Sequence, residues 1–370
     1  MILDELDPPS RAVLQQHNFD AATFDRLRLE LREGRLTPGL NVVPGVVEAP
    51  RASDLTPMPS PGERGFDEAM AVGTEALRAG TIAVVVLAGG MATRFGGGVK
   101  AVAEALDGRS FLEIKLGETR RLAEALRCTI PEALMTSFAT DDAIGAYLAE
   151  HDLGEPLRFV QPAAPRLRPD GGLFLDSEEK PSLYGQGHGD LFSTLRMSGV
   201  LDSFVEAGVH SVMVSNVDNL AARLDPAIVG MHVLAGTPLT VEVVPTDSNS
   251  GGAPARVDGR PRLLEAFQFP PEFDQGTVPV FNTNTSLITV EALADPGPLT
   301  WLVVEKSVGG EPVIQFERLY HELSAHVATT FLVVPRSGPR GRFLPVKQLK
   351  DLEEVQPLLR EMLACSPASG

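Results

Sequence analysis

Cysteine and tryptophan are scarce in this sequence, which has two cysteines and one tryptophan among its 370 residues. Cys128 and Cys365 cannot form a disulfide framework, and they stand in no metal-binding spacing. Long apolar runs are also missing, since the longest, at residues 82–88, is far too short to cross a bilayer. The first twelve residues contain three acidic side chains and no apolar core, unlike a signal peptide. These absences predict a reducing, cytoplasmic location and no membrane partner.

Positive charge is in deficit as well. Lys and Arg number 32 and Asp and Glu number 49, which gives a net charge of −17. A chain this acidic repels nucleic acid, so we expect no nucleic-acid partner. Polyanionic substrates would need a local cluster of cations, and the sequence offers one near its end: Arg336, Arg340, Arg342, Lys347 and Lys350. A solvated basic face would explain Arg340 and Lys350 equally well.

The pattern of apolar residues divides the chain into three parts. Residues 1–65 contain a helical segment, to about residue 36, and then a Pro/Gly-rich stretch that we expect to be a linker or a wrapping arm. Residues 66–352 form the main predicted domain. Residues 353–370 are expected to be a C-terminal helix and tail.

Several continuous apolar runs within the main domain show no alternation and are typical of strands buried on both faces. They lie at residues 82–88, 211–215, 239–244, 278–281 and 330–334. Helical patterns lie between several of them, for example at 118–127 and 190–207. Strands that alternate with helices predict an α/β fold with a mixed, mostly parallel open sheet covered by helices on both faces.

A glycine-rich loop follows the first of these runs. Residues 89–98 contain five glycines, which would let the backbone approach a ligand closely. Arg94 and Lys100 add positive charge, so the loop could hold a triphosphate. It lacks the signatures of a P-loop and of a dinucleotide site, and glycine clusters after strands are often plain turns.

Other strand ends carry polar groups. Asp218, within the string SNVDN at 215–219, could ligate Mg²⁺, although an Asx-turn would explain it too. Residues 282–285 (NTNT) follow the fourth run and suit sugar hydroxyls, or again a turn. In the string GHGD at 187–190, the glycines could turn backbone amides toward a ligand, and Asp190 would cap the next helix. His321 and His326 are five residues apart, diverge on a helix, and predict no metal site.

The order of these segments resembles the UTP–glucose-1-phosphate uridylyltransferase (UDP-glucose pyrophosphorylase) family of the eukaryotic type. The first loop is similar to that family's L-x-G-G-x-G-T-x-x-G…P-K signature, and QPAAPR at 161–166 to its Q-x-x-x-P-R element. Further similar strings lie at 132–142, 187–190, 198–202, 214–219, 263–265, 282–284, 334–337 and 342–347. The resemblance implies a Rossmann-like, GT-A-like fold and makes residues 66–352 a nucleotidyltransferase catalytic domain. It ends near residue 352, so we expect no C-terminal β-helical domain.

The resemblance also implies roles for single residues. Gly89, Gly90 and Gln161 would contact the uracil and ribose of UTP, with Gly187 near the base. His188 and Asp218 would lie by the phosphates, Asp218 on Mg²⁺. Lys100 and Lys347 would bind phosphates, beside Arg94 in the loop. The residues expected to bind sugar hydroxyls are Gly189, Asn219, Glu265, Asn282 and Asn284.

The expected substrates are therefore UTP and a sugar 1-phosphate, first of all glucose 1-phosphate. Two alternatives stay open at this point. Arg94 resembles the arginine in the glycine-rich loop of N-acetylhexosamine-1-phosphate uridylyltransferases. Ala92 and Val99 depart from the family's loop, which would suit a non-catalytic relative that binds nucleotide sugars.

Overall fold

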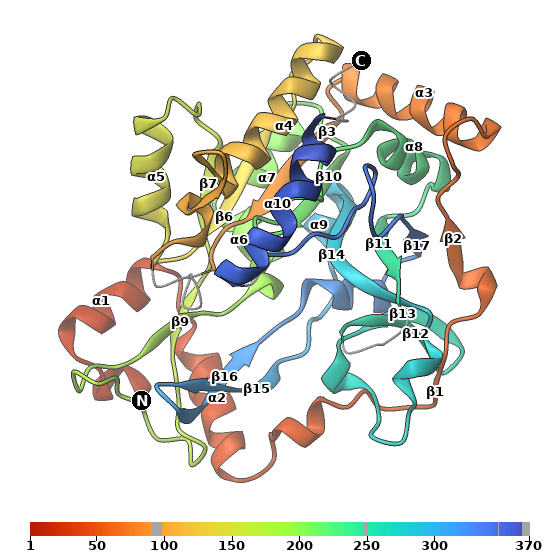
Figure 1. Ribbon diagram of the computed structural model, residues 1–370. Coiled ribbons are helices and arrows are strands. Elements are labelled where there is room, and N and C mark those ends of the chain that lie inside the picture. The colour runs from red at the N-terminus through yellow and green to blue at the C-terminus, as the bar shows by residue number, and fades with distance from the viewer. Residues whose placement is uncertain (91–97, 247–250, 347, 365–370) are drawn as a thin grey trace.

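The chain folds around one eight-stranded sheet (Figure 1). The structure, a computed structural model, describes residues 1–90, 98–246, 251–346 and 348–364. The strand order is β2 (Leu55–Pro57), β17 (Thr329–Val333), β11 (Leu239–Pro245), β14 (Val280–Thr289), β10 (Ser211–Asn216), β3 (Ile82–Leu87), β6 (Glu132–Thr136) and β7 (Leu157–Val160). β14 is antiparallel to both of its neighbours, and the other pairings are parallel. The predicted mixed, mostly parallel sheet is confirmed.

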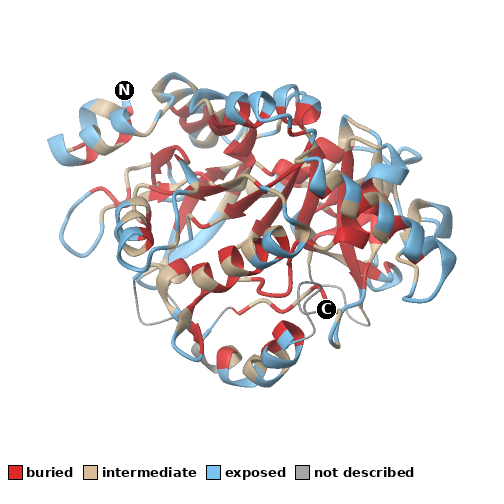
Figure 2. Cartoon of the chain, turned by 90° about the horizontal axis from the view of Figure 1, so that it is seen from above, coloured by how far each residue is buried: buried red, intermediate tan, exposed pale blue. Residues whose placement is uncertain are grey.

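The apolar run of β3 shows why both faces of the sheet are covered. Side chains alternate across a strand, so Val84 and Val86 face one core while Ala83 and Val85 face another. The first core is closed by α3 (Arg64–Arg78), α4 (Phe111–Leu126), α8 (Pro226–Ala235) and α10 (Leu349–Ala364). The second core is closed by α6 (Leu191–Met197), α7 (Val200–Glu206) and α9 (Val290–Ala294). Figure 2 shows the buried strands between helices whose outer sides are exposed.

Smaller elements flank this sheet. Helices α1 (Pro8–Gln16) and α2 (Ala21–Arg32) lie near two hairpins, which are β8 (Ala163–Pro165) with β9 (Leu183–Gly185) and β15 (Leu302–Val308) with β16 (Glu311–Glu317). In the Pro/Gly-rich arm, β1 (Val47–Glu48) joins β12 (Ala253–Val257) and β13 (Arg260–Leu264), while β2 joins the edge of the main sheet. The remaining α-helix is α5 (Asp141–Glu150), and the remaining strands are β4 (Glu104–Leu106) and β5 (Arg109–Ser110). The arm therefore runs along the main sheet and the sheet of β12 and β13. The division into domains stays a prediction.

The structure corrects two expected boundaries. The helix expected over residues 190–207 is divided at Gly199 into α6 and α7. The strand expected at 278–281 continues to Thr289 as β14, so the polar string at 282–285 lies within a strand rather than after it. A β-bulge opposite Val241–Val243 accommodates this string, and Asn284 adopts a φ of +59° there. Within the described residues, no helix has the length and apolar character needed to span a bilayer.

Candidate active site

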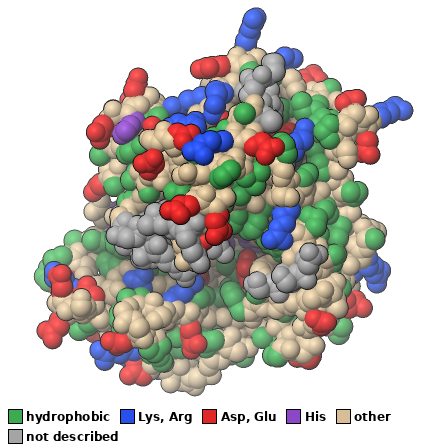
Figure 3. Space-filling model, in the orientation of Figure 1, with side chains coloured by type: hydrophobic (Ala, Val, Ile, Leu, Met, Phe, Trp, Pro, Cys, Tyr) green, Lys and Arg blue, Asp and Glu red, His purple; other side chains and the backbone are tan. Residues whose placement is uncertain are grey.

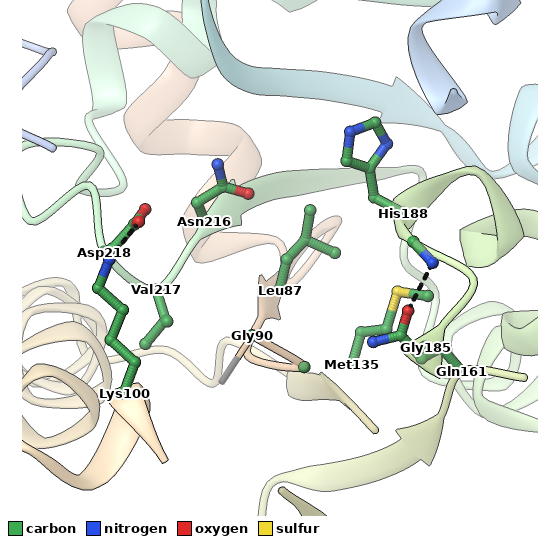
Figure 4. Close-up of a pocket in the computed structure, with 12 residues that line it drawn as sticks. Leu87, Gly90, Lys100, Met135, Gln161, Gly185, His188, Asn216, Val217 and Asp218 are labelled. Carbon is green, nitrogen blue, oxygen red and sulfur yellow. Dashed lines mark hydrogen bonds and ion pairs between the residues drawn. The ribbon is translucent and has the colours of Figure 1, made fainter. Parts of the chain in front are cut away.

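A pocket of about 340 Å³ opens beyond the carboxyl ends of β3, β6 and β10 (Figure 4). Ligands of open α/β sheets collect at this edge. The residues that line it are Leu87, Gly89, Gly90, Lys100, Met135, Gln161, Gly185, Gly187, His188, Asn216, Val217 and Asp218. Seven of them were expected at the site from the sequence: Gly89, Gly90, Lys100, Gln161, Gly187, His188 and Asp218. The fold thus gathers segments that are far apart in the chain.

Gln161 lies at one end of the pocket, between two glycine backbones. Its Oε1 accepts a hydrogen bond of 2.9 Å from the Gly187 backbone N–H. A Cβ on Gly89 would collide with the Gln161 amide nitrogen, and a Cβ on Gly185 would lie 2.7 Å from its amide carbon. Only glycine leaves room for the amide at these two positions, so the loop and the β9 segment together fix its orientation.

His188 borders the same end of the pocket, as Figure 4 shows. Burial, together with a smaller effect of the Lys306 charge, lowers the pKa of its imidazole to about 4. Its Nδ1 accepts a weak hydrogen bond of 3.5 Å from the Tyr320 backbone N–H. A neutral ring that accepts at Nδ1 carries its proton on Nε2. At neutral pH, His188 is therefore a hydrogen-bond donor rather than a cation.

Lys100 and Asp218 form an ion pair at the opposite end (Figure 4). The Lys100 Nζ lies 2.7 Å from the Asp218 Oδ2, and the two side chains are 12% and 26% exposed. Asp218 follows β10, and Lys100 enters from the segment after the glycine-rich loop. The pair places a positive and a negative group side by side in the pocket. Acidic and basic side chains are also interspersed elsewhere on the surface seen in Figure 3.

The bulge in β14 adds polar groups beside this pocket. Asn284 donates from Nδ2 to the Asn216 Oδ1 at 2.7 Å, and its backbone N–H donates to the Asn282 Oδ1 at 3.0 Å. Asn282 and Asn284 are both half-buried. Glu265 is half-buried too, and burial raises the pKa of its carboxyl. A Cβ on Gly252, whose carbonyl accepts from the Asn282 N–H, would lie 2.9 Å from the Glu265 oxygens. Three of the residues expected to bind sugar therefore lie near one another.

Gly189 and Asn219 have structural contacts of their own. A Cβ on Gly189 would collide with the Arg318 backbone, so no larger residue fits. The Asn219 amide donates to the Arg342 carbonyl at 3.0 Å and accepts from the Leu344 N–H at 2.9 Å. These bonds fix the segment that leads to residue 347. Sugar contacts by Gly189 and Asn219 stay predictions.

Asp190 differs from the expected helix cap. It precedes α6, but its side chain makes no capping hydrogen bond. It forms an ion pair with Arg318 instead, in a place where the Asp190 side chain is fully buried. A fully buried carboxylate is costly unless an oppositely charged group pairs with it, whereas other groups can satisfy the end of a helix. The Asp190 side chain therefore pairs with Arg318 instead of capping α6.

In the part of the chain that the structure describes, three arginines of the C-terminal basic segment contact protein groups. Arg342 is 3% exposed and makes two hydrogen bonds of 2.7 Å to Glu242, which is fully buried. Arg340 pairs with Asp225, and Arg336 lies over the Phe281 ring. These contacts assign Arg342 to the core. Arg94 and Lys347 lie outside the described residues, as do the side chain of Lys350 and the whole of Ala92.

Some lining residues carried no expectation of a role. Asn216 stands beside Asp218 in the string that pointed to the site, so the strand-end position was its signal. Leu87 and Met135 belong to apolar strand patterns, which do not distinguish a pocket residue from a core residue. Gly185 is recognisable only through its distance to Gln161, which depends on tertiary structure.

Comparison with known proteins shows the family of this chain. A family model described as UTP--glucose-1-phosphate uridylyltransferase matches residues 67–362, most of the chain. The chain belongs to this family. The match spans both ends of the pocket and the β14 bulge.

Members of the uridylyltransferase family resemble this chain in sequence and in structure. The UTP--glucose-1-phosphate uridylyltransferase of Astragalus penduliflorus is 32% identical over 295 residues, with 74% of this chain and 62% of that protein covered. The chain spans about three fifths of the length of such curated relatives. The solved structure of a UDP-glucose phosphorylase from Trypanosoma brucei has a TM-score of 0.74 at 25% identity, covering 92% of this chain and 77% of that one.

The uridine diphosphate N-acetylglucosamine pyrophosphorylase of Trypanosoma brucei has a TM-score of 0.75 at 19% identity. The comparison covers 97% of this chain and 79% of that one. At this identity the likeness shows the shared fold, and it does not distinguish between sugars. The predicted nucleotidyltransferase fold is confirmed by both structures.

Proposed function

We propose that this chain transfers the uridylyl group of UTP to a sugar 1-phosphate, in the first place glucose 1-phosphate, and releases pyrophosphate. One observation carries the proposal most directly. The pocket joins a fixed amide and glycine backbones at one end to the Lys100–Asp218 pair at the other. Such a pocket suits a ligand with a polar planar group at one end and a chain of phosphates at the other.

The Gln161 end suits the nucleotide base. A uracil presents carbonyl and N–H groups in a plane, and the Gln161 amide with neighbouring backbone groups offers complementary donors and acceptors. Gly89, Gly90 and Gly187 let the base and ribose approach the backbone closely. The neutral His188, which borders this end, offers a hydrogen-bond donor to the nucleotide, and Lys100 contributes positive charge to the phosphates at the other end. Lys347 and Arg94, which only the sequence resemblance assigns to this site, would add positive charge near the phosphates.

The β14 side suits the sugar. Hydroxyl groups both donate and accept, and amide side chains do the same. Asn282, Asn284 and Glu265 therefore form the proposed sugar subsite, with Gly189 and Asn219 supporting its shape. The half-buried positions of the first three leave polar atoms within reach of a ligand.

The donor set also suits Mg²⁺ that arrives with the triphosphate. Asp218 is the carboxylate among the described lining residues, and those residues contain no group of three potential metal-binding side chains. Mg²⁺ commonly binds one or two carboxylates together with substrate phosphates. One Asp218 oxygen pairs with Lys100, and the other, which has no partner among the described residues, would suit such an ion. When bound, Mg²⁺ would offset negative charge on the phosphates.

The reaction needs no nucleophile from the protein. A phosphate oxygen of the sugar 1-phosphate, already ionised at neutral pH, attacks the α-phosphorus of UTP. The bond from that phosphorus to the bridging oxygen of the β-phosphate breaks, and pyrophosphate leaves with the electron pair. The protein aligns two anions that repel each other, and such positioning can contribute about 7–11 kcal/mol.

A pyrophosphate-release assay tests the proposal. The purified chain is mixed with UTP, Mg²⁺ and, in separate reactions, glucose 1-phosphate or N-acetylglucosamine 1-phosphate. We expect release with glucose 1-phosphate. Release with the N-acetylated sugar alone would correct the sugar. No release with either sugar, together with binding of UDP-glucose, would overturn the reaction in favour of a non-catalytic relative. The cytoplasmic location and the lack of nucleic-acid partners stay predictions.

A further inference from the structure

His321 lies against the proposed sugar subsite and beside His188, which lines the pocket. It belongs to a 3₁₀ helix at Tyr320–Ala325 that follows β16. Its ring centroid lies 5.6 Å from that of His188, with the two planes nearly perpendicular, and 3.8 Å from that of Tyr320. The three rings therefore form a packed group behind His188.

One hydrogen bond connects this group to β14. The His321 Nε2 lies 3.3 Å from the Asn282 Nδ2. The Asn282 Oδ1 already accepts from the backbone N–H of Asn284, so the amide nitrogen is the atom that faces His321. An amide nitrogen can only donate, and the His321 Nε2 must therefore accept. This assigns the proton of His321 to Nδ1.

The surroundings of His321 keep it in this state. The residue is 2% exposed, and burial holds the pKa of its imidazole well below the usual value, with His188 acting in the same direction. Its Nδ1 has no hydrogen-bond partner within the described chain. A proton on Nε2 would face the Asn282 donor and leave both ring nitrogens unsatisfied, which disfavours the other tautomer. At neutral pH the His321 Nε2 is therefore unprotonated and accepts a hydrogen bond.

The orientation of Asn282 is passed on along β14. Its Oδ1 holds the backbone N–H of Asn284, which has a φ of +59°, and the Asn284 Nδ2 donates to the Asn216 Oδ1 at 2.7 Å. Asn216 lines the pocket two residues before Asp218. Among the described residues, the second N–H of each β14 amide and the Asn284 Oδ1 have no partner, so these groups suit sugar hydroxyls.

We propose that His321 is a positioning residue for the sugar subsite, which fixes the Asn282 amide and through it the bulge that carries Asn284. The inference rests on the proposed function, because it takes the β14 amides as the groups that bind the sugar. His321 itself contacts no substrate. Its loss would remove the acceptor from the half-buried Asn282 N–H and free the amide to rotate.

Calorimetric binding of UDP-glucose and of UTP to the full chain tests this role without requiring turnover. In His321→Phe the ring shape is kept and the acceptor is lost. We expect UDP-glucose to bind about 10- to 100-fold more weakly than to wild type, with UTP affinity changed less than about twofold. In His321→Gln a side-chain oxygen can replace Nε2, and we expect most of the UDP-glucose affinity to return.

The melting temperature of each variant serves as the control for folding. Unchanged UDP-glucose affinity in folded His321→Phe would overturn the inference, as would an equal loss of both ligands. A His321→Gln variant as weak as His321→Phe would also contradict it. Wild-type chain that binds UDP-glucose but releases no pyrophosphate would overturn the proposed reaction and leave the positioning role intact.

Discussion

The amide nitrogen of Gln161 occupies the space that a side chain on Gly89 would need. Gly89 follows β3, and Gln161 follows β7, so the relationship joins two strand ends. The other face of the same amide is close to Gly185, and its oxygen is held by the Gly187 N–H. Gly89 is thus required for the position of another side chain rather than for its own backbone conformation.

Gly89→Ala should therefore act through Gln161. The new methyl group displaces a flexible side chain, so we expect a small loss of stability and about a tenfold rise in the Kd for UTP. Gln161→Ala should raise that Kd by a similar factor. In the double variant the clash is gone, and the loss should equal that of Gln161→Ala alone. Calorimetry of UTP binding measures all three, and losses that multiply would refute the coupling.

Asp218→Asn tests the carboxylate at the phosphate end. The change keeps the shape and removes the charge that would hold Mg²⁺ and that pairs with Lys100. We expect the Mg²⁺ concentration for half-maximal pyrophosphate release to rise at least tenfold. The matched control is Asp225→Asn, on the same connection after β10, where the carboxylate pairs with Arg340 and caps α8. An unchanged Mg²⁺ titration in Asp218→Asn would remove Asp218 from the metal site.

The sequence predicts the strands better than the contacts between them. The apolar run of β3 specifies a strand buried on both faces, because any register leaves its side chains in a core. The polar string in β14 has the composition of a turn, and only the bulge against β11 explains why it continues a strand. Arg342 shows the same limit. Its charge suggests a phosphate ligand, whereas its pairing with Glu242, 100 residues away, makes it part of the core.

Lys347→Ala tests a residue known from the sequence alone. The resemblance places Lys347 at the phosphates, and the bonds from Asn219 to Arg342 and Leu344 fix the segment just before it. We expect normal melting and a kcat lowered by about 10²- to 10³-fold, the usual cost of losing one preorganised donor. Lys350→Ala, three residues further on, is the control and should retain most activity. Near-normal turnover in Lys347→Ala would exclude it from the mechanism.

Lys115 is a buried amine beneath the site. It is 6% exposed, and its Nζ donates to the Ala222 carbonyl at 2.7 Å and to the Ser215 hydroxyl at 3.2 Å. Burial lowers the pKa of Lys115 to about 7, and the positive charge of Arg342 contributes in the same direction. The amine of an unfolded chain has its usual pKa near 10.4. Between these two values the unfolded chain binds more protons than the folded one.

Stability must therefore rise with pH across that window because of Lys115. This gain in stability is complete above the pKa that Lys115 has in the unfolded chain. It is lost as the pH falls toward 7, where the amine of the folded chain also becomes charged. Lys115→Met removes this dependence. We expect the free energy of unfolding of wild type to gain about 1–3 kcal/mol relative to the variant between pH 7 and pH 9, measured by urea denaturation. Lys180→Met, which alters an exposed lysine paired with Glu178, should follow the wild-type curve. A difference between wild type and Lys115→Met that stays constant with pH would show that Lys115 titrates at its ordinary pKa in the folded chain.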